Sequence, residues 1–334
     1  MVAKANTTFT SKVMKRKNNL FSKIISIENL KAAELKARKG KTKQPGVKEF
    51  DKDCETNILK LHSMLADKTF RTSEYITFKI YEPKERVVYR LPYFPDRIAH
   101  HAIMNVLEEL FVSVFTADTY SCIKGKGIHG ASRSLIESLK DTTGTKYCLK
   151  LDIKKFYPNV DHQILKRLLR RKIKDNELLW LLDEIIDSAD GLPIGNYLSQ
   201  YLANFYLTYF DHWIKETKQE RHYFRYADDM VILSGSKTHL QELLVEIREY
   251  LDTQLKLTVK ENYQVFPVAS RGIDFVGYVH YHGYVLLRKS IKKNCARKAA
   301  KGINKKTKAS YNGWLGHCNA KHLTKKIYGT TKKV

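Results

Sequence analysis

The sequence reads HYFRYADDMVILSG from His222 to Gly235, two short apolar runs with an acidic pair between them. Apolar runs of this length and composition predict two strands, with the acidic pair at the turn that joins them. Asp228 and Asp229 are adjacent, so their like charges would destabilise such a turn. A divalent cation offsets this repulsion, and the turn is therefore a candidate metal site.

A third carboxylate ends the apolar part of another run, KYCLKLDIKKFY, from Lys146 to Tyr157. Asp152 lies where a strand could meet the hairpin turn of its neighbour. Three carboxylates from two strands form the hard-oxygen set that Mg²⁺ prefers, with positions left for water and phosphate. Two such ions about 3.5–4 Å apart would activate a hydroxyl nucleophile and stabilise a leaving phosphate group. The alternative is that the acidic pair is only a polar loop tip. Other features of the chain are needed to distinguish this from a metal site.

The charge of the chain indicates a polyanionic partner. Lys and Arg number 60 against 35 Asp and Glu, which gives a net charge of +25. Residues 288–334 carry 15 basic residues and no acidic one, and residues 1–48 carry 13 basic and two acidic residues. Each Lys or Arg that neutralises a phosphate releases condensed counterions, so nucleic acid is the expected partner. A merely soluble basic protein and a binder of anionic membranes are the alternatives.

The cysteines and the apolar stretches bear on location. The five cysteines form no C-x-x-C pair, so a zinc site is not expected. Their odd number and wide spacing favour free thiols in a reducing compartment. The first residues lack the apolar core of a signal peptide, and no apolar stretch approaches the ~18 residues of a membrane span. We therefore expect a cytoplasmic protein without a membrane partner.

The apolar patterns predict an α+β fold. Two runs between Tyr75 and Phe94 predict paired strands, and residues 273–287 predict a hairpin with Gly283 near its tip. Helical spacing is found in residues 97–111, 162–173, 177–189, 197–214 and 239–255. The order of elements from Lys146 to Leu287 predicts a small antiparallel sheet with helices on one face. The basic segment after it is expected to be helical, with interruptions at Gly302, Gly313 and Gly316.

Together these motifs resemble those of reverse transcriptases. YADD (Tyr226–Asp229) resembles the metal-binding turn of that family, and LKLDIKKFYPNVDH (Leu149–His162) resembles its first metal-binding strand. GLPIGNYLSQ (Gly191–Gln200) resembles the loop and helix over the nascent base pair, and FVGY (Phe275–Tyr278) the hairpin that holds the primer. The motifs follow the family's order over roughly residues 75–290. The resemblance implies a right-hand polymerase that makes DNA on an RNA template with two Mg²⁺ ions.

The resemblance also implies an organisation into fingers, palm and thumb. The expected parts are a basic N-terminal extension with helices (1–74), fingers (75–147), a palm (148–287) with finger-contributed helices at about 160–190, and a basic thumb (288–334). Gly125, Gly127 and Gly130 form a G-x-G-x-x-G pattern, with Asp152 some twenty residues later. This pattern imitates a dinucleotide-binding fingerprint, but no apolar strand precedes it. We expect these glycines to shape a loop near the template in the fingers instead.

The resemblance gives roles to the acidic residues and their neighbours. Asp152, Asp228 and Asp229 are the implied catalytic residues and metal ligands, together with the backbone carbonyl of Ile153. Tyr157 lies where the family has an aromatic ring that excludes a ribose 2′-hydroxyl; an ordinary core aromatic is the alternative.

Other implied contacts are with the nucleotide, the primer and the template. Lys84 and Arg86 match the basic residues that bind the triphosphate, and which of these two and Arg90 touches phosphate stays open. Lys260 is either a proton donor to pyrophosphate or a solvated surface charge. The implied nucleotide-binding set also includes Ile194 and Gly195, and the primer- and template-binding set is Phe275, Gly277, Tyr278, Arg288 and Lys289.

A narrower resemblance is to the reverse transcriptases of diversity-generating retroelements. It rests on Ile194 followed by Ser199-Gln200, where most reverse transcriptases have Gln and Ser-Pro, and on the run from Ala269 to Ser290 before a short basic thumb. It implies error-prone synthesis at template adenines. The implied partners are a template RNA, the cDNA/RNA hybrid, deoxynucleoside triphosphates and a small basic pentameric accessory protein. Alternatives are another bacterial reverse transcriptase, of retron or defence type, and a maturase-like RNA-binding protein.

Overall fold

The chain divides into two compact units in the computed structural model, which describes residues 16–81 and 85–329. The first unit comprises residues 1–110 and 160–202, and the second comprises residues 111–159 and 203–334. Two helices, α5 (Ile98–Val114) and α9 (Tyr197–His212), cross the boundaries between these ranges. Each unit is described by itself below.

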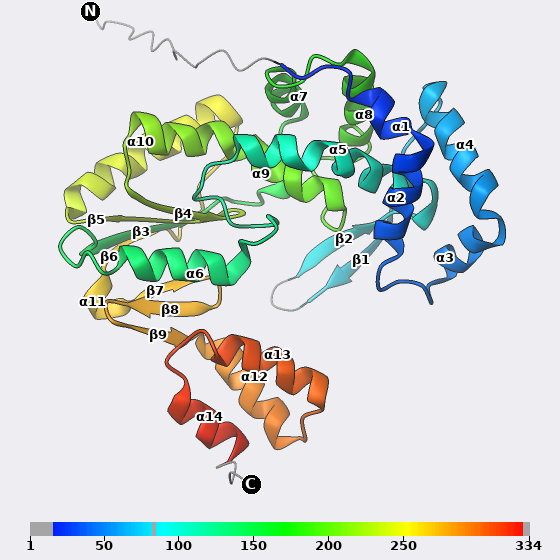
Figure 1. Cartoon of the computed structure of the whole chain (residues 1–334). Helices are drawn as coiled ribbons and strands as arrows, with labels where there is room; N and C mark the ends of the chain where they lie inside the picture. Colours follow the sequence, from blue (N-terminus) through cyan, green and yellow to red (C-terminus); the bar gives the residue numbers. More distant parts are fainter. Residues whose placement is uncertain (1–15, 82–84, 330–334) are drawn as a thin grey trace, which may run out of the picture. The chain divides into compact units, whose positions relative to one another are not determined.

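The first unit is helical apart from one hairpin (Figure 1). Its helices, besides parts of α5 and α9, are α1 (Phe21–Ile25), α2 (Ile27–Arg38), α3 (Pro45–Phe50), α4 (Cys54–Ala66), α7 (His162–Arg170) and α8 (Asn176–Ile186). The hairpin pairs β1 (Ile76–Ile80) with β2 (Arg86–Arg90), with Ile80 opposite Arg86. The pair of strands was predicted from the β-branched and aromatic residues of these runs.

Asp175 joins segments of the first unit that are far apart in the sequence. Its carboxylate caps α8 by accepting a hydrogen bond from Leu178 N (3.1 Å). The same carboxylate accepts hydrogen bonds from Leu20 N (2.7 Å) and Phe21 N (2.9 Å) at the start of α1. A buried acid with several backbone donors is well satisfied, and it ties the first described helix to α8.

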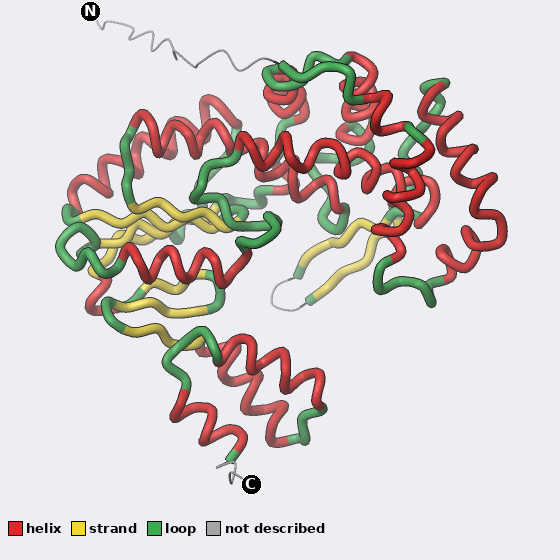
Figure 2. Tube along the Cα trace, viewed as in Figure 1, coloured by secondary structure: helices red, strands yellow, loops and turns green. Residues whose placement is uncertain are grey.

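The second unit is built on a four-stranded antiparallel sheet with the strand order β4-β5-β3-β6. Strands are drawn in yellow in Figure 2. The strands are β3 (Tyr147–Asp152), β4 (His222–Tyr226), β5 (Asp229–Ser234) and β6 (Gln264–Pro267). A separate three-stranded sheet contains β7 (Ile273–Phe275), β8 (Tyr278–Tyr281) and β9 (Tyr284–Leu287). The hairpin predicted for residues 273–287 is therefore the β8–β9 part of a larger sheet.

Helices cover both faces of the four-stranded sheet, because α6 (Gly127–Ser138), which precedes the Lys146–Leu287 span of the one-face prediction, covers the second face. α10 (Lys237–Leu255) packs on β3, β5 and β6, whereas α6 packs on β4 from the other face (Figure 1). Gly127 has φ +66°, a conformation available to glycine, and it begins α6. The expected loop at Gly125–Gly130 is thus largely the first turn of a helix. Its apolar residues Ala131 and Leu135 are fully buried.

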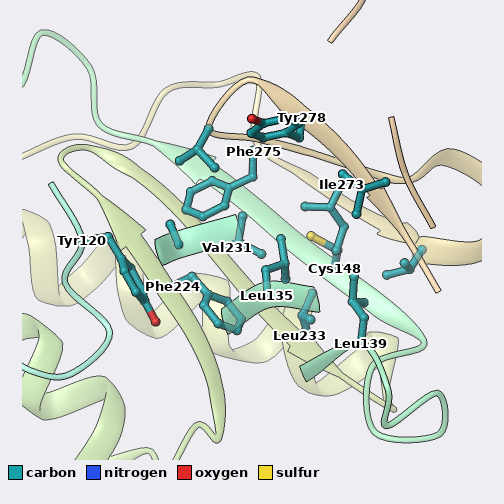
Figure 3. Close-up of a cluster of buried hydrophobic side chains, with 14 of the residues drawn as sticks. Tyr120, Leu135, Leu139, Cys148, Phe224, Val231, Leu233, Ile273, Phe275 and Tyr278 are labelled. Carbon is teal, nitrogen blue, oxygen red and sulfur yellow. The ribbon is translucent and has the colours of Figure 1, made fainter. Parts of the chain in front are cut away.

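A hydrophobic cluster lies on the α6 face of the sheet (Figure 3). It joins α6 to Cys148, Phe224, Val231 and Leu233 of the four-stranded sheet, and to Ile273, Phe275 and Tyr278 of the three-stranded sheet. Alternation along the strands places Leu149, Leu151, Tyr223, Met230 and Ile232 on the opposite face. Asp152 lies on the same face of β3 as Cys148, and Asp229 lies on the same face of β5 as Val231 and Leu233. Both carboxylates are therefore on the side of the hydrophobic cluster.

The basic C-terminal segment is helical, as predicted. It contains α12 (Lys289–Ala300), α13 (Lys305–Leu315) and α14 (Lys321–Tyr328), with Gly302 and Gly316 between helices. Gly313 lies inside α13, so the predicted interruption there was wrong. Leu315 and Ala320 are buried in the hydrophobic cluster, which shows that this segment shares a core with the three-stranded sheet. Among the described residues, none of the helices is both long and apolar enough to cross a membrane.

Candidate active site

The β4–β5 hairpin turns at Ala227 and Asp228. Tyr226 is opposite Asp229 in the register, so only two residues form the loop. Ala227 has φ +55°, a left-handed conformation that residues with a Cβ rarely adopt. The favoured two-residue hairpin loops require a positive φ at their first central residue, which explains this conformation. The turn places two consecutive carboxylates at the end of the sheet.

Asp152, the last residue of β3, is paired with Asp229, the first residue of β5. Directly opposite residues of an antiparallel pair share a face and have Cβ atoms about 4.5–5.5 Å apart. The expected meeting of the strand-end acid with the hairpin turn is confirmed by this register. The catalytic and metal-binding roles of the three aspartates stay predictions.

Burial and repulsion raise the pKa of two of these carboxyl groups. Burial, followed by the charge of Asp152, raises the pKa of Asp228 to about 6. Burial also raises the pKa of Asp229, while the ammonium group of Lys150 acts in the opposite direction. Groups with raised pKa values gain most from a cation, because the cation removes the repulsion between their charged forms.

Two lysines lie against the aspartates. Lys260 Nζ is 2.5 Å from Asp152 Oδ1. Lys150 Nζ is 3.2 Å from Asp229 Oδ1 and 3.4 Å from Oδ2. Although Lys150 is within ion-pair distance, the buried Oδ1 atom of Asp229 makes no hydrogen bond of good geometry. This oxygen therefore retains an acceptor position.

The donor set fits a divalent cation, although the side chains are not already gathered around one point. Within residues 16–81 and 85–329, no three His, Cys, Asp or Glu side chains form a ready cluster of metal ligands. Hydrogen bonds flank Ile153, from Lys154 N to Thr258 O and from Lys260 N to Asp152 O, each 2.8 Å. Neither uses the Ile153 carbonyl. Three carboxylates, one with a buried oxygen that accepts no hydrogen bond, and this carbonyl are hard-oxygen ligands of the kind that Mg²⁺ takes.

Tyr157 lies in the same unit as the aspartates, five residues after Asp152. It begins a short 3₁₀ turn, Tyr157–Asn159, and is partly buried. Its ring packs edge-on against Phe156, with 5.6 Å between the ring centroids. Phe156 is buried, so the neighbouring aromatic supplies the core contact and Tyr157 lies nearer the surface.

The predicted nucleotide-binding residues of the fingers lie in the first unit. Arg86 begins β2 and is exposed, whereas Lys84 lies outside the described residues. Ile194 accepts a hydrogen bond from Tyr89 N (2.8 Å) through its carbonyl. Gly195 lies so close to β2 that an added Cβ would be 2.5 Å from Tyr89 O. Ile194 and Gly195 are therefore fixed against the strand that also carries Arg86.

A polar pocket of about 280 Å³ lies beside Gly195 in the first unit, and Lys41, Arg97, His100 and His101 contribute to its lining. Burial lowers the pKa of His100 and of His101 to about 4, so both rings are neutral at pH 7. His101 stacks on Tyr197 with 4.8 Å between ring centroids, whereas His100 is buried. The two rings have different surroundings, as expected for adjacent residues of a helix. Sequence reasoning missed Lys41 and Arg97, which the fold brings together from the loop after α2 and from the helical turn Tyr93–Arg97 that precedes α5.

The predicted primer-binding residues surround the tight β7–β8 turn. Phe275 and Tyr278 are fully buried, so their side chains belong to the hydrophobic cluster. Gly277 has φ +90°, and an added Cβ would lie 2.4 Å from the Trp314 ring. Any contact of this turn with a primer therefore comes from its backbone. Arg288 and Lys289 follow β9 and are more exposed.

Comparison with known proteins identifies the family. Residues 82–280 match the family described as reverse transcriptase (RNA-dependent DNA polymerase). The chain belongs to the reverse transcriptase family. Domains of this family use divalent metal ions, in keeping with the donor set at the end of β3 and β5. The α+β fold with small antiparallel sheets is similar to a telomerase structure from Candida albicans, with a TM-score of 0.50 and 10% identity over 80% of this chain and 58% of that one. This likeness confirms the predicted right-hand polymerase class of fold.

Relatives of several kinds match this reverse transcriptase. Protein YkfC of Escherichia coli K12 is 25% identical over 248 residues, which cover 60% of this chain and 65% of YkfC. The group II intron-encoded protein LtrA of Lactococcus lactis is 22% identical over 56% of this chain and 43% of LtrA. The Ec73 retron reverse transcriptase of Escherichia coli is 25% identical over 52% of this chain and 58% of its own length. The chain thus spans between 43% and 65% of the length of these relatives.

Sequence reasoning missed a buried polar network next to the YADD turn of this reverse transcriptase. Arg225, the residue before Tyr226, is fully buried and pairs with Asp211 of α9, which is also fully buried. The available signal was a single charged residue inside each of two apolar runs, HYFRY and FYLTYFDHWI. A buried charge needs a partner, but the sequence does not say which acid pairs with which base.

Proposed function

We propose that the chain is an active RNA-directed DNA polymerase. The pairing of Asp152 with Asp229, beside Asp228 of the YADD turn, is the observation that carries this proposal. We further propose fingers at residues 75–147, a palm at 148–287 with finger-contributed helices at about 160–190, and a thumb at 288–334, after a basic extension at 1–74. A cytoplasmic location is proposed on the cysteine pattern.

Asp152, Asp228 and Asp229, with the Ile153 carbonyl, would hold two Mg²⁺ ions in this proposal. Bound there, the ions would activate a primer 3′-hydroxyl and stabilise the leaving pyrophosphate. Lys260 orients the Asp152 carboxylate through its 2.5 Å contact, and it is the proposed proton donor to pyrophosphate. Arg86, Lys84 and Arg90 are the proposed triphosphate-binding cations. Ile194 and Gly195, fixed against β2, are proposed to contact the incoming nucleotide.

Primer extension tests this function directly. We expect the chain to extend a DNA primer on an RNA template with deoxynucleoside triphosphates and Mg²⁺. Replacing the deoxynucleotides with ribonucleotides should suppress extension, because Tyr157 is proposed to occupy the space of a 2′-hydroxyl. Binding of the primer–template without any extension under these conditions would instead support a maturase-like RNA-binding protein.

The basic helices after β9 are the proposed contact with the primer–template, and their exposed lysines offer a test. Lys298 and Lys306 line a pocket of about 440 Å³ with Tyr311 and Trp314. Basic side chains interleaved with aromatics suit a nucleic-acid surface. The Lys298→Gln/Lys306→Gln variant should bind RNA more weakly, and its slope of log affinity against log salt should fall by about 1–2, because two phosphate contacts are lost. Fluorescence anisotropy at several salt concentrations measures both effects.

Substitution is preferable here to deletion of residues 288–334. Leu315 and Ala320 belong to the hydrophobic cluster, so a truncated chain would expose part of its core. Lys140→Gln is the matched control, since Lys140 is exposed on the same unit and pairs only with Glu137 among the described ion pairs. An unchanged salt slope in the double variant would count against the thumb assignment.

The narrower proposal is that the chain is the reverse transcriptase of a diversity-generating retroelement and makes frequent errors at template adenines. Ile194, Ser199-Gln200 and the run from Ala269 to Ser290 support it by resemblance. In this proposal the enzyme works with a structured template RNA and a small basic pentameric accessory protein. Group II intron and retron relatives match at 22–25% identity, so a retron, defence or intron-related role is the alternative.

Ile194→Gln tests the fidelity part of this proposal. The Ile194 carbonyl is held by Tyr89, so the substitution should change the side chain without moving the backbone. A glutamine can hydrogen-bond near the new base pair, and one such bond discriminates by about 1–2 kcal/mol, or about 10-fold. We expect adenine errors to fall by about that factor when cDNA is sequenced. Ile194→Leu, which stays apolar, should keep the wild-type error rate, and equal adenine errors in all three proteins would refute the role of Ile194.

A further inference from the structure

Ala227, the residue before Asp228, is held at both its backbone N–H and its carbonyl by side chains outside the two-residue turn. Ala227 N donates a hydrogen bond to Ser121 Oγ (3.1 Å). Ala227 O accepts one from Arg225 Nη1 (3.0 Å). Ala227 has φ +55°, and residues held in such sparsely populated conformations persist only where their surroundings over-determine them. These two hydrogen bonds supply that constraint.

Asn204 of α9 connects the two supporting side chains. Its Oδ1 atom accepts hydrogen bonds from Ser121 Oγ (3.0 Å) and from Arg225 Nη1 (3.1 Å). Its Nδ2 atom donates to the Ser121 carbonyl (2.8 Å). Ser121, Asn204 and Arg225 are each at most 2% exposed, so water does not compete for these bonds. All of these residues belong to the second unit.

The loop that carries Ser121 is itself fixed to the hairpin. Arg225 N donates a hydrogen bond to Asp118 O, and Tyr120 N donates one to Arg225 O; each bond is 3.0 Å long. The loop therefore pairs with β4 through a bridge between Thr119 and Arg225. Ser121 is thus placed by backbone bonds on one side and by Asn204 on the other. Its hydroxyl donates its one hydrogen to Asn204 Oδ1 and accepts a hydrogen bond from Ala227 N.

We propose that Ser121 is a positioning residue for the metal-binding turn, acting through Ala227 on the direction of the Asp228 carboxylate. The inference rests on the proposed polymerase function and adds to it a residue about one hundred positions away in the sequence. Without the Ser121 hydroxyl, Ala227 N loses its partner, and the left-handed residue relaxes. Asp228 then turns away from Asp152, and the two carboxylates can less readily share one cation.

The test compares Ser121→Ala with Ser132→Ala. Ser132 is equally buried (2% exposed, as is Ser121), and its hydroxyl contacts His280 Nε2 at 2.8 Å, away from the turn. Residues that orient metal ligands typically affect metal affinity or activity by about 10–100-fold. For Ser121→Ala we expect kcat to fall by about that factor, the deoxynucleotide KM to change less than twofold, and Mn²⁺ binding to the free protein, followed by electron paramagnetic resonance, to weaken about 10-fold. The fall in Tm should match that of Ser132→Ala, and Ser121→Thr should restore kcat.

The outcomes separate this inference from the proposed function. If the wild type extends primers and Ser121→Ala equals Ser132→Ala in kcat and Mn²⁺ affinity, the positioning role is overturned while the function stands. If the wild type does not extend primers, the function fails, and Mn²⁺ binding alone decides the role of Ser121. Should Ser121→Ala not fold, Ser121→Cys keeps the shape with a weaker acceptor; it should bind Mn²⁺ more weakly than wild type, and wild-type affinity would overturn the inference.

Discussion

The Asp228→Asn variant should lose nearly all primer extension on RNA, by about 10³-fold or more, which corresponds to about 4 kcal/mol of transition-state stabilisation. An amide is a poorer ligand for a hard cation than a carboxylate, and it removes one of three negative charges at the end of β3 and β5. Because the substitution keeps the size of the side chain, binding of the primer–template should stay close to that of the wild type. Steady-state extension assays and anisotropy measure the two effects separately.

The same substitution should stabilise the metal-free protein at neutral pH. The pKa of Asp228 is raised to about 6 from 3.8, so the folded state binds the proton more tightly than the unfolded state. The wild type therefore loses stability as pH rises from about 4 to 6, and the penalty is complete above pH 6. A shift of this size is worth about 3 kcal/mol at most, and partial solvent screening reduces it to about 1–2 kcal/mol.

Urea unfolding without divalent ions should thus show Asp228→Asn to be more stable than wild type at pH 7.5 and equal to it at pH 4. Asp252→Asn removes the same charge from an exposed position on α10 and should change neither activity nor stability. A lower stability of Asp228→Asn at pH 7.5 would show that burial and the charge of Asp152 do not disfavour the ionised Asp228 carboxylate in the metal-free state. Extension at the wild-type rate would remove Asp228 from the catalytic set.

The elements around the acidic turn could be predicted because their sequence signals are local. Strand periodicity and a two-residue turn set the β4–β5 hairpin, and Asp152 ends an apolar run whose length and composition favour a strand. Antiparallel register then brings Asp152 to Asp229. The residues that match the family were recognisable for the same reason, since each motif lies within at most 14 consecutive residues.

The remaining features depend on contacts between distant segments. The FVGY motif predicts that Phe275 and Tyr278 contact the primer. The burial of their side chains follows from packing against α6 and α13, which the motif does not reveal. The helix α6 begins at glycines, which ordinarily predict a loop, and its burial against β4 outweighs their low helix propensity. Likewise, Ser121, Asn204 and Asp211 lie outside every motif, and only the fold brings them to the turn.

Breaking the buried Arg225–Asp211 pair should have the largest effect on stability. Arg225 Nε and Nη2 lie 2.7 Å and 2.5 Å from the two Asp211 oxygens. Asp211 also accepts hydrogen bonds from Tyr223 Oη (2.6 Å) and Thr119 Oγ1 (3.1 Å), so the carboxylate is fully satisfied. Removing one partner of a buried pair leaves an uncompensated charge and typically costs about 3–5 kcal/mol. Arg225→Met and Asp211→Leu should each destabilise the protein by that amount in urea unfolding.

The double variant Arg225→Met/Asp211→Leu separates stability from positioning. Apolar side chains of similar size can replace a buried ion pair at little net cost, so the double variant should recover most of the stability that either single variant loses. It should not recover primer extension, because Ala227 O still lacks the Arg225 donor. Glu49→Gln, which breaks the exposed Lys52–Glu49 pair, should leave stability unchanged. Additive losses in the double variant would show that the two charges do not depend on each other, and full activity in it would show that the turn keeps its geometry without Arg225.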